Sequence, residues 1–115
     1  MERILKKWKE CMILCNQKQF TYILLCNDNT FYIGYTNNLY LRILKHNLKK
    51  ASKYTRGRTP VKLVYYDEFK TKSEALKNEF ILKKYTKKQK IKYITLNMTS
   101  EKNILIKKIN EENKL

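Results

Sequence analysis

Two tyrosines on neighbouring aromatic runs are the first candidates for chemistry. Tyr22 lies in the run 21–24 and Tyr32 in the run 32–34, and turn-forming residues 27–30 separate the two. If these runs pair as adjacent strands, both phenol hydroxyls can point toward one end of a sheet. A phenol has an ordinary pKa of about 10, so it accepts a proton near neutral pH only where nearby cations lower that pKa.

Arg42 and His46 lie four residues apart in the next segment, so on a helix they share one face. An arginine offers a fork of donors for phosphate oxygens, and a histidine can accept or relay a proton near neutral pH. The alternatives without chemistry are a solvated helix charge for Arg42 and a satisfied surface or core imidazole for His46.

Glu79 lies on or beside the apolar stripe of a further predicted helix, between Leu76 and Phe80. A carboxylate there must be paired or coordinated, because burying an unpaired charge is costly. One carboxylate is enough for a cation such as Mg²⁺, which keeps several waters and takes oxygens from a substrate. The alternatives are an ion pair between Glu79 and Lys83, and a metal site at residues 67–68 instead.

These side chains together match the requirements of phosphodiester hydrolysis. That reaction needs an activated water, a cation to neutralise the phosphate and support for the leaving oxygen. A basic loop adds candidate contacts to a phosphate backbone, with a tyrosine that packs or stacks; its residues are Lys53, Tyr54, Arg56 and Arg58. Lys83, in a later lysine run, would extend this nucleic-acid-binding track, unless that run is simply a solvated helix face. Gly34 can bring backbone close to a bound phosphate, although a bulge or a tight strand end would also explain a glycine there.

The composition agrees with a nucleic-acid partner. The chain has 115 residues, enough for one compact domain, and 26 Lys and Arg against 10 Asp and Glu give a formal net charge of +16. Such a charge favours a polyanion, with nucleic acid as the first candidate and an anionic membrane surface as the second. A compositional bias toward lysine is the alternative, and a basic membrane-surface or ribosome-associated structural protein is the function that charge alone would support.

Other classes are disfavoured. Three cysteines without a CxxC spacing predict neither a disulfide framework nor a structural zinc site. No apolar stretch approaches the ~20 residues of a membrane span, and the apolar run 11–15 is too short for a signal peptide. We therefore expect an intracellular protein of the cytoplasm or nucleoid, or of a host cytoplasm if viral, with neither a membrane nor a small molecule as partner.

The elements that must position these residues can be read along the chain. An amphipathic helix is expected over 4–15 and a hairpin over 20–26 and 31–35. A helix that begins near Leu39, with Asn37 or Asn38 as its cap, should end by about Lys50. Residues 51–60 read as a loop and 61–69 as a third strand. The pattern Thr71 to Glu74 fits a capping box that opens a helix to about Tyr85.

Thr86 can cap the next helix, and the segment after Ser100 has weaker helical spacing. This order predicts an α+β fold, a small three-stranded and at least partly antiparallel sheet flanked by helices. We expect an N-terminal helix over 1–19, the main domain over 20–97 and a C-terminal helical tail over 98–115, in one globular domain overall.

At these residues the chain resembles the GIY-YIG nuclease superfamily, especially its small stand-alone members. The resemblance covers about residues 20–97 with the spacing intact. The matching positions are Tyr22, Tyr32-Ile33-Gly34, Leu39 with Arg42, His46, residues 53–65, Ser73-Glu74-Ala75-Leu76, Glu79 and Lys83.

The resemblance implies a small sheet with flanking helices and one divalent cation, Mg²⁺ or Mn²⁺, held by Glu79. It also implies that Arg42 contacts phosphate and that a Tyr32 phenolate acts as general base on water, assisted by Tyr22 and His46. The first motif reads Thr21-Tyr22-Ile23 where the family has Gly-Ile-Tyr, which keeps the tyrosine and loses a glycine. Tyr35 stands where the repair nuclease of the family has a lysine, so the cation beside the base must come from elsewhere.

The function expected from the resemblance is a metal-dependent endonuclease on duplex or branched DNA, with RNA possible. It would be structure-selective or weakly sequence-specific and would serve DNA repair, recombination or defence. The alternative is a low-activity or inactive nucleic-acid-binding module of the same fold that acts with a partner.

Overall fold

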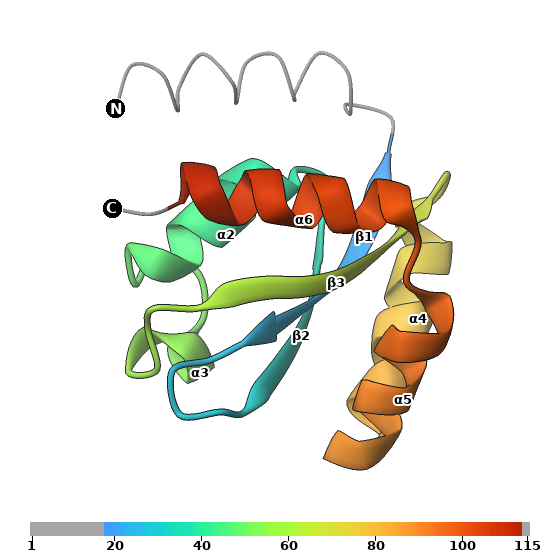
Figure 1. Cartoon of the computed structure of the whole chain (residues 1–115), viewed down its shortest axis with the longest axis horizontal. Coiled ribbons are helices and arrows are strands. Elements are labelled where there is room, and N and C mark those ends of the chain that lie inside the picture. Colours follow the sequence, from blue (N-terminus) through green and yellow to red (C-terminus); the bar gives the residue numbers. More distant parts are fainter. Residues whose placement is uncertain (1–17, 114–115) are drawn as a thin grey trace.

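The computed structural model describes residues 18–113, and the helix expected over 4–15 lies outside the described residues. Within residues 18–113 the chain forms three strands and five helices (Figure 1). Their order is β1 (Gln19–Leu25), β2 (Phe31–Thr36), α2 (Leu39–Asn47), α3 (Lys53–Arg56), β3 (Lys62–Phe69), α4 (Lys72–Lys83), α5 (Lys87–Asn97) and α6 (Ser100–Glu112). No helix in this range has both the length and the apolar character to cross a membrane.

The three strands make one antiparallel sheet in the order β2-β1-β3. This confirms the predicted α+β class and the hairpin between β1 and β2. The hairpin turn is closed by a bond from the Cys26 amide to the Thr30 carbonyl at 2.8 Å, and Asn29 adopts a left-handed φ of 66°. Asparagine tolerates that conformation, which explains its place in the turn.

Alternate residues of β1 enter two different cores, as the period of a strand requires. Phe20, Tyr22 and Leu24 pack against α2 and α6, and Ile106 and Ile109 of α6 belong to that cluster. The residue between two of them, Ile23, packs with Ile33, Tyr65 and Leu82 on the α4 side. Helices therefore cover both faces of the sheet, with α2 and α6 on one and α4 and α5 on the other (Figure 1).

One local prediction needs correction. Helix α2 begins at Leu39 under the Asn38 cap and ends at Asn47, both as expected; Asn47 bonds the Val61 backbone and Lys49 adopts a φ of 64°. The segment 51–60 is not wholly a loop. Ser52 caps the one-turn helix α3 by accepting a bond from the Tyr54 amide.

The remaining helices begin where the sequence predicts. Thr71 accepts a bond from the Glu74 amide at the start of α4. Thr86 and Gln89 form a reciprocal capping box at the start of α5, so α4 stops at Lys83, before the predicted Tyr85. The C-terminal helix exists as well, and its buried isoleucines make it part of the cover of the sheet.

Candidate active site

The ring of Tyr22 lies over Gly34, its partner across the β1–β2 pair. A Cβ atom placed on Gly34 would stand 2.4 Å from both the Cζ and the hydroxyl oxygen of Tyr22. The backbone of Gly34 needs no left-handed φ, since neither glycine has one. The structure therefore explains Gly34 by the room that Tyr22 requires, and a phosphate contact at Gly34 stays a prediction.

A chain of hydrogen bonds links four residues in the order Arg42, Tyr22, His46 and Thr55. Arg42 Nε donates to the Tyr22 hydroxyl at 3.2 Å, and the same hydroxyl lies 2.7 Å from His46 Nε2. On the far side of the imidazole, His46 Nδ1 lies 2.8 Å from the Thr55 hydroxyl. The structure thus brings together Tyr22, Arg42 and His46, three of the residues predicted from the sequence.

Burial determines the protonation states of Tyr22 and His46 in this hydrogen-bond chain. It raises the pKa of the Tyr22 phenol well above the ordinary value, although the nearby Arg42 guanidinium opposes the effect. Burial and the charge of Arg42 lower the pKa of His46 to about 4. At neutral pH the phenol is protonated and the imidazole is neutral.

Tyr22 has no exposed surface, so in this conformation it cannot touch a substrate directly. Tyr32 and Arg42, which lie beside Tyr22, are half-buried. The ring centroid of Tyr32 is 6.4 Å from that of Tyr22 and 5.2 Å from that of His46. Burial lowers the pKa of Arg42, but bonds to the Tyr22 and Tyr32 hydroxyls raise it more, so Arg42 is the cation that serves both phenols.

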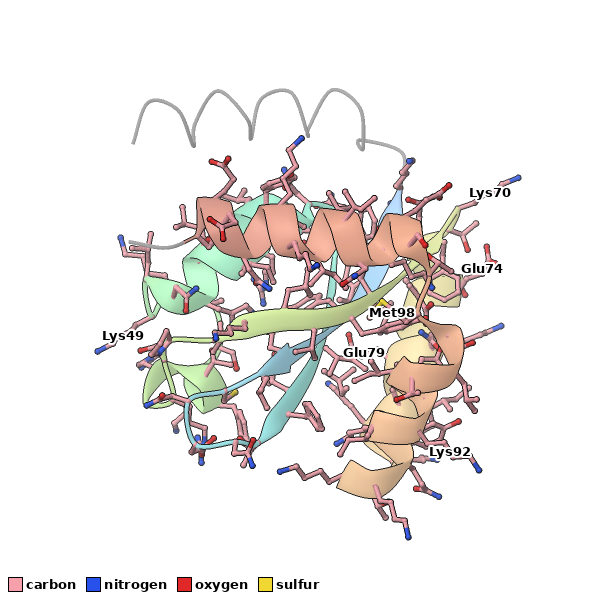
Figure 2. All side chains as sticks on the ribbon, in the orientation of Figure 1. Lys49, Lys70, Glu74, Glu79, Lys92 and Met98 are labelled. Carbon is pink, nitrogen blue, oxygen red and sulfur yellow. The ribbon has the colours of Figure 1, made fainter. Side chains whose placement is uncertain are left out.

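Glu79 comes from α4, on the opposite face of the sheet, and lies on the side of that helix nearest the strands (Figure 2). Its side chain is 19% exposed, and its Oε1 atom lies 2.9 Å from Lys83 Nζ. Its negative charge adds a minor part to the raised pKa of Tyr22, which burial dominates.

The donor set fits a hard cation held by one carboxylate. Across residues 18–113, no group of three or more His, Cys, Asp or Glu side chains could hold a metal ion by itself. Mg²⁺ can be bound through one or two carboxylates when waters and substrate oxygens complete the shell. The ion pair with Lys83 is also present, so both interpretations of Glu79 keep a structural basis.

The alternative metal site at residues 67–68 loses its main ligand. Asp67 accepts bonds from the Tyr65 hydroxyl at 2.6 Å, Lys102 Nζ at 3.0 Å and Asn78 Nδ2 at 3.1 Å, and from the Tyr93 hydroxyl. Glu68 is exposed and pairs with Lys18 at 3.3 Å. Asp67 instead joins β3 to α4, α5 and α6, and its half-buried oxygens are satisfied by these bonds.

The basic loop divides into two pairs of side chains. Arg58 donates to Asp28 at 2.8 Å and to the Tyr54 carbonyl at 2.6 Å, and its guanidinium carbon lies 4.0 Å from the Tyr54 ring centroid. Tyr54 also stacks on Tyr32 at 5.9 Å. Arg58 therefore packs on Tyr54, which contacts Tyr32, whereas Lys53 and Arg56 are exposed.

Tyr35, at the position where the family's repair nuclease has a lysine, lies apart from this chain of bonds. Its hydroxyl donates to Gln19 Oε1, and Lys72 Nζ lies 5.5 Å from its ring centroid. The cation beside Tyr22 and Tyr32 is Arg42 instead.

Thr55 is not among the residues predicted from the sequence, yet it is fully buried against His46. A threonine in a basic loop carries no chemical signal of its own. Only the folding of α3 against α2 brings its hydroxyl to the imidazole, so spacing could not reveal the contact.

The chain is similar in sequence to several known proteins. The chain is 51% identical over 77 residues to a UPF0213 protein of Staphylococcus epidermidis, covering 67% of this chain and 94% of the relative. It is 42% identical over 92 residues to the UPF0213 protein YazA of Bacillus subtilis, covering 80% of this chain and 93% of YazA. A solution NMR structure of a UPF0213 protein from Bacillus halodurans aligns with a TM-score of 0.49 and 37% identity, over 76% of this chain and 93% of that one.

The relatives' names state no reaction. The GIY-YIG catalytic domain, however, matches residues 18–92, which include every site residue described above. A domain of this kind indicates a nuclease and a nucleic-acid substrate in general terms. With the match spanning most of the described residues, the chain belongs to the GIY-YIG catalytic domain family.

Proposed function

We propose that this protein is a divalent-metal-dependent endonuclease that hydrolyses phosphodiester bonds in DNA. The observation that carries the proposal is the convergence of Tyr32, Arg42 and the buried Tyr22–His46 pair at one place, with the Glu79 carboxylate acting on it from the other face of the sheet. The net charge of +16 supports a polyanionic substrate.

The half-buried residues supply the groups that would meet the substrate. Tyr32 is the proposed general base, because it is the phenol of the pair that is not fully covered and it lies beside Arg42. Arg42 keeps its charge at all working pH values and can donate to the scissile phosphate. Tyr22 and His46 lie beneath them and hold Arg42 in place.

Glu79 is the residue that would hold Mg²⁺ or Mn²⁺. When bound, such an ion neutralises charge on the phosphate and stabilises the leaving oxygen. For Glu79 to serve as a metal ligand, its carboxylate has to break the ion pair with Lys83 or contact both the metal ion and the Lys83 ammonium.

Two variants at this ion pair test the proposal. Glu79→Ala should abolish Mg²⁺-dependent nicking of supercoiled plasmid while leaving duplex affinity within a few fold, because the exposed lysines remain. Lys83→Ala removes the competing cation, so it should lower the Mg²⁺ concentration that gives half-maximal nicking. Undiminished cleavage by Glu79→Ala would overturn the metal assignment, and an unchanged Mg²⁺ response in Lys83→Ala would show that the ion pair does not compete.

A second candidate is a nucleic-acid-binding module of the same fold with little activity. The observations that favour it are the ion pair on Glu79 and the presence of Tyr35 where the family's repair nuclease has a lysine. Incubation with linear, nicked, flapped and four-way DNA, with and without Mg²⁺ or Mn²⁺, separates the two. Salt-sensitive binding to all of these without any nicking would favour the module.

A further inference from the structure

The hydrogen-bond chain behind Arg42 has a direction that its donors and acceptors determine. The Tyr22 hydroxyl is fully buried and lies against two nitrogen atoms, Arg42 Nε and His46 Nε2. Arg42 Nε always carries a hydrogen and cannot accept one. Of these two partners, therefore, only His46 Nε2 can receive the hydrogen of the Tyr22 hydroxyl.

The other side of the imidazole gives the same direction independently. The Thr55 hydroxyl lies 3.3 Å from the Ser52 carbonyl, to which it donates, and 2.8 Å from His46 Nδ1. A hydroxyl has one hydrogen, so a Thr55 that donates to Ser52 must accept from His46 Nδ1. His46 is fully buried, which favours the neutral imidazole with one hydrogen only.

We propose that Thr55 is a positioning residue that holds His46 in the Nδ1–H tautomer. Because His46 Nε2 then accepts the Tyr22 hydrogen, the Tyr22 oxygen is left free to accept the hydrogen bond from Arg42 Nε. In this tautomer the hydrogens run from Arg42 to Tyr22, from Tyr22 to His46, from His46 to Thr55 and from Thr55 to Ser52. The Arg42 guanidinium is then oriented through its Nε atom.

The opposite tautomer would undo that orientation. With a hydrogen on Nε2, His46 would compete with Arg42 for the Tyr22 oxygen, and the phenol hydrogen would point toward the guanidinium without an acceptor. A buried donor left unpaired is unfavourable, and a misdirected one also repels Arg42. The catalytic consequence of this inference rests on the proposed endonuclease function, whereas the tautomer itself does not.

The chain offers an unambiguous test, because His46 is its single histidine. Long-range ¹H–¹⁵N NMR spectra of the uniformly ¹⁵N-labelled full chain at pH 7 report which ring nitrogen carries the hydrogen. We expect Nδ1 to show the protonated signature in the wild type and in Thr55→Ser, and Thr55→Val to move toward the Nε2–H pattern. A wild-type spectrum with Nε2–H, or a Thr55→Val spectrum identical to the wild type, would overturn the inference.

The wild-type and Thr55→Ser spectra decide the question even if Thr55→Val does not fold, which its backbone amide spectrum would reveal. In the nicking assay Thr55→Val should lower kcat by about tenfold or more, and Thr55→Ser should restore it. An inactive wild type that still has the Nδ1–H signature would refute the endonuclease and support the tautomer assignment. Wild-type kcat in a folded Thr55→Val with a switched tautomer would refute the positioning role.

Discussion

Gly34 and Tyr22 face each other across the β1–β2 pair so closely that any side chain at position 34 would displace the phenol. This contact explains how a residue without a functional group becomes part of the candidate active site. The hydroxyl that bonds Arg42 and His46 can reach them only because the strand beneath it carries no Cβ.

Gly34→Ala should therefore impair both stability and nicking. Overpacking of this kind costs typically about 1–3 kcal/mol, and the shifted Tyr22 would lose its bond to His46. Gly57→Ala is the matched control, because a Cβ there meets no atom within 4 Å and its φ is −96°, so it should change stability by less than about 0.5 kcal/mol. Urea unfolding and plasmid nicking measure the two effects, and equal behaviour of both variants would contradict the packing argument.

The buried imidazole predicts how stability depends on pH. In the folded protein the pKa of His46 is lowered to about 4, below the ordinary 6.5, so the unfolded chain binds a proton first as the pH falls. The neutral His46 imidazole therefore contributes roughly 3 kcal/mol to the free energy of unfolding. This contribution is fully present above about pH 6.5 and is lost as the pH falls through about 4. Urea unfolding at a series of pH values in this window measures it.

His46→Gln provides the control for this pH effect. The variant should be less stable than the wild type at pH 7, yet its stability should change much less between pH 6.5 and 4. If both proteins lose stability in parallel, the imidazole is not the group responsible.

Arg56 and Arg58 should behave differently although they are two residues apart. Arg56→Ala removes an exposed charge, so DNA affinity should fall and the slope of log affinity against log salt should become shallower by about 0.9 if it neutralises one phosphate. Arg58 is engaged by Asp28 and Tyr54, so Arg58→Ala should chiefly loosen the loop, with little loss of stability because the ion pair is exposed. Fluorescence anisotropy across a salt series distinguishes them, and an equal loss of slope would show that Arg58 also contacts phosphate.

Local features of this protein can be predicted from its sequence because they depend on neighbours in the chain. The caps at Asn38, Thr71 and Thr86 start helices where expected, since each cap satisfies amides two or three residues ahead. The hairpin follows from two β-forming runs around a turn, and the antiparallel sheet confirms it. The family motifs also point to residues that do meet in space, namely Tyr22, Arg42 and His46.

Tertiary structure alone decided the roles within the site. The burial of His46, the contact of its Nδ1 with Thr55 and the ring of Tyr22 over Gly34 all join segments that are distant in the chain. Periodicity and residue type specify which face a side chain occupies, but not which partner stands opposite it. That is determined when α2, α3 and the β1–β2 hairpin pack together and exclude water, and the same packing sets the charge states on which the proposed chemistry depends.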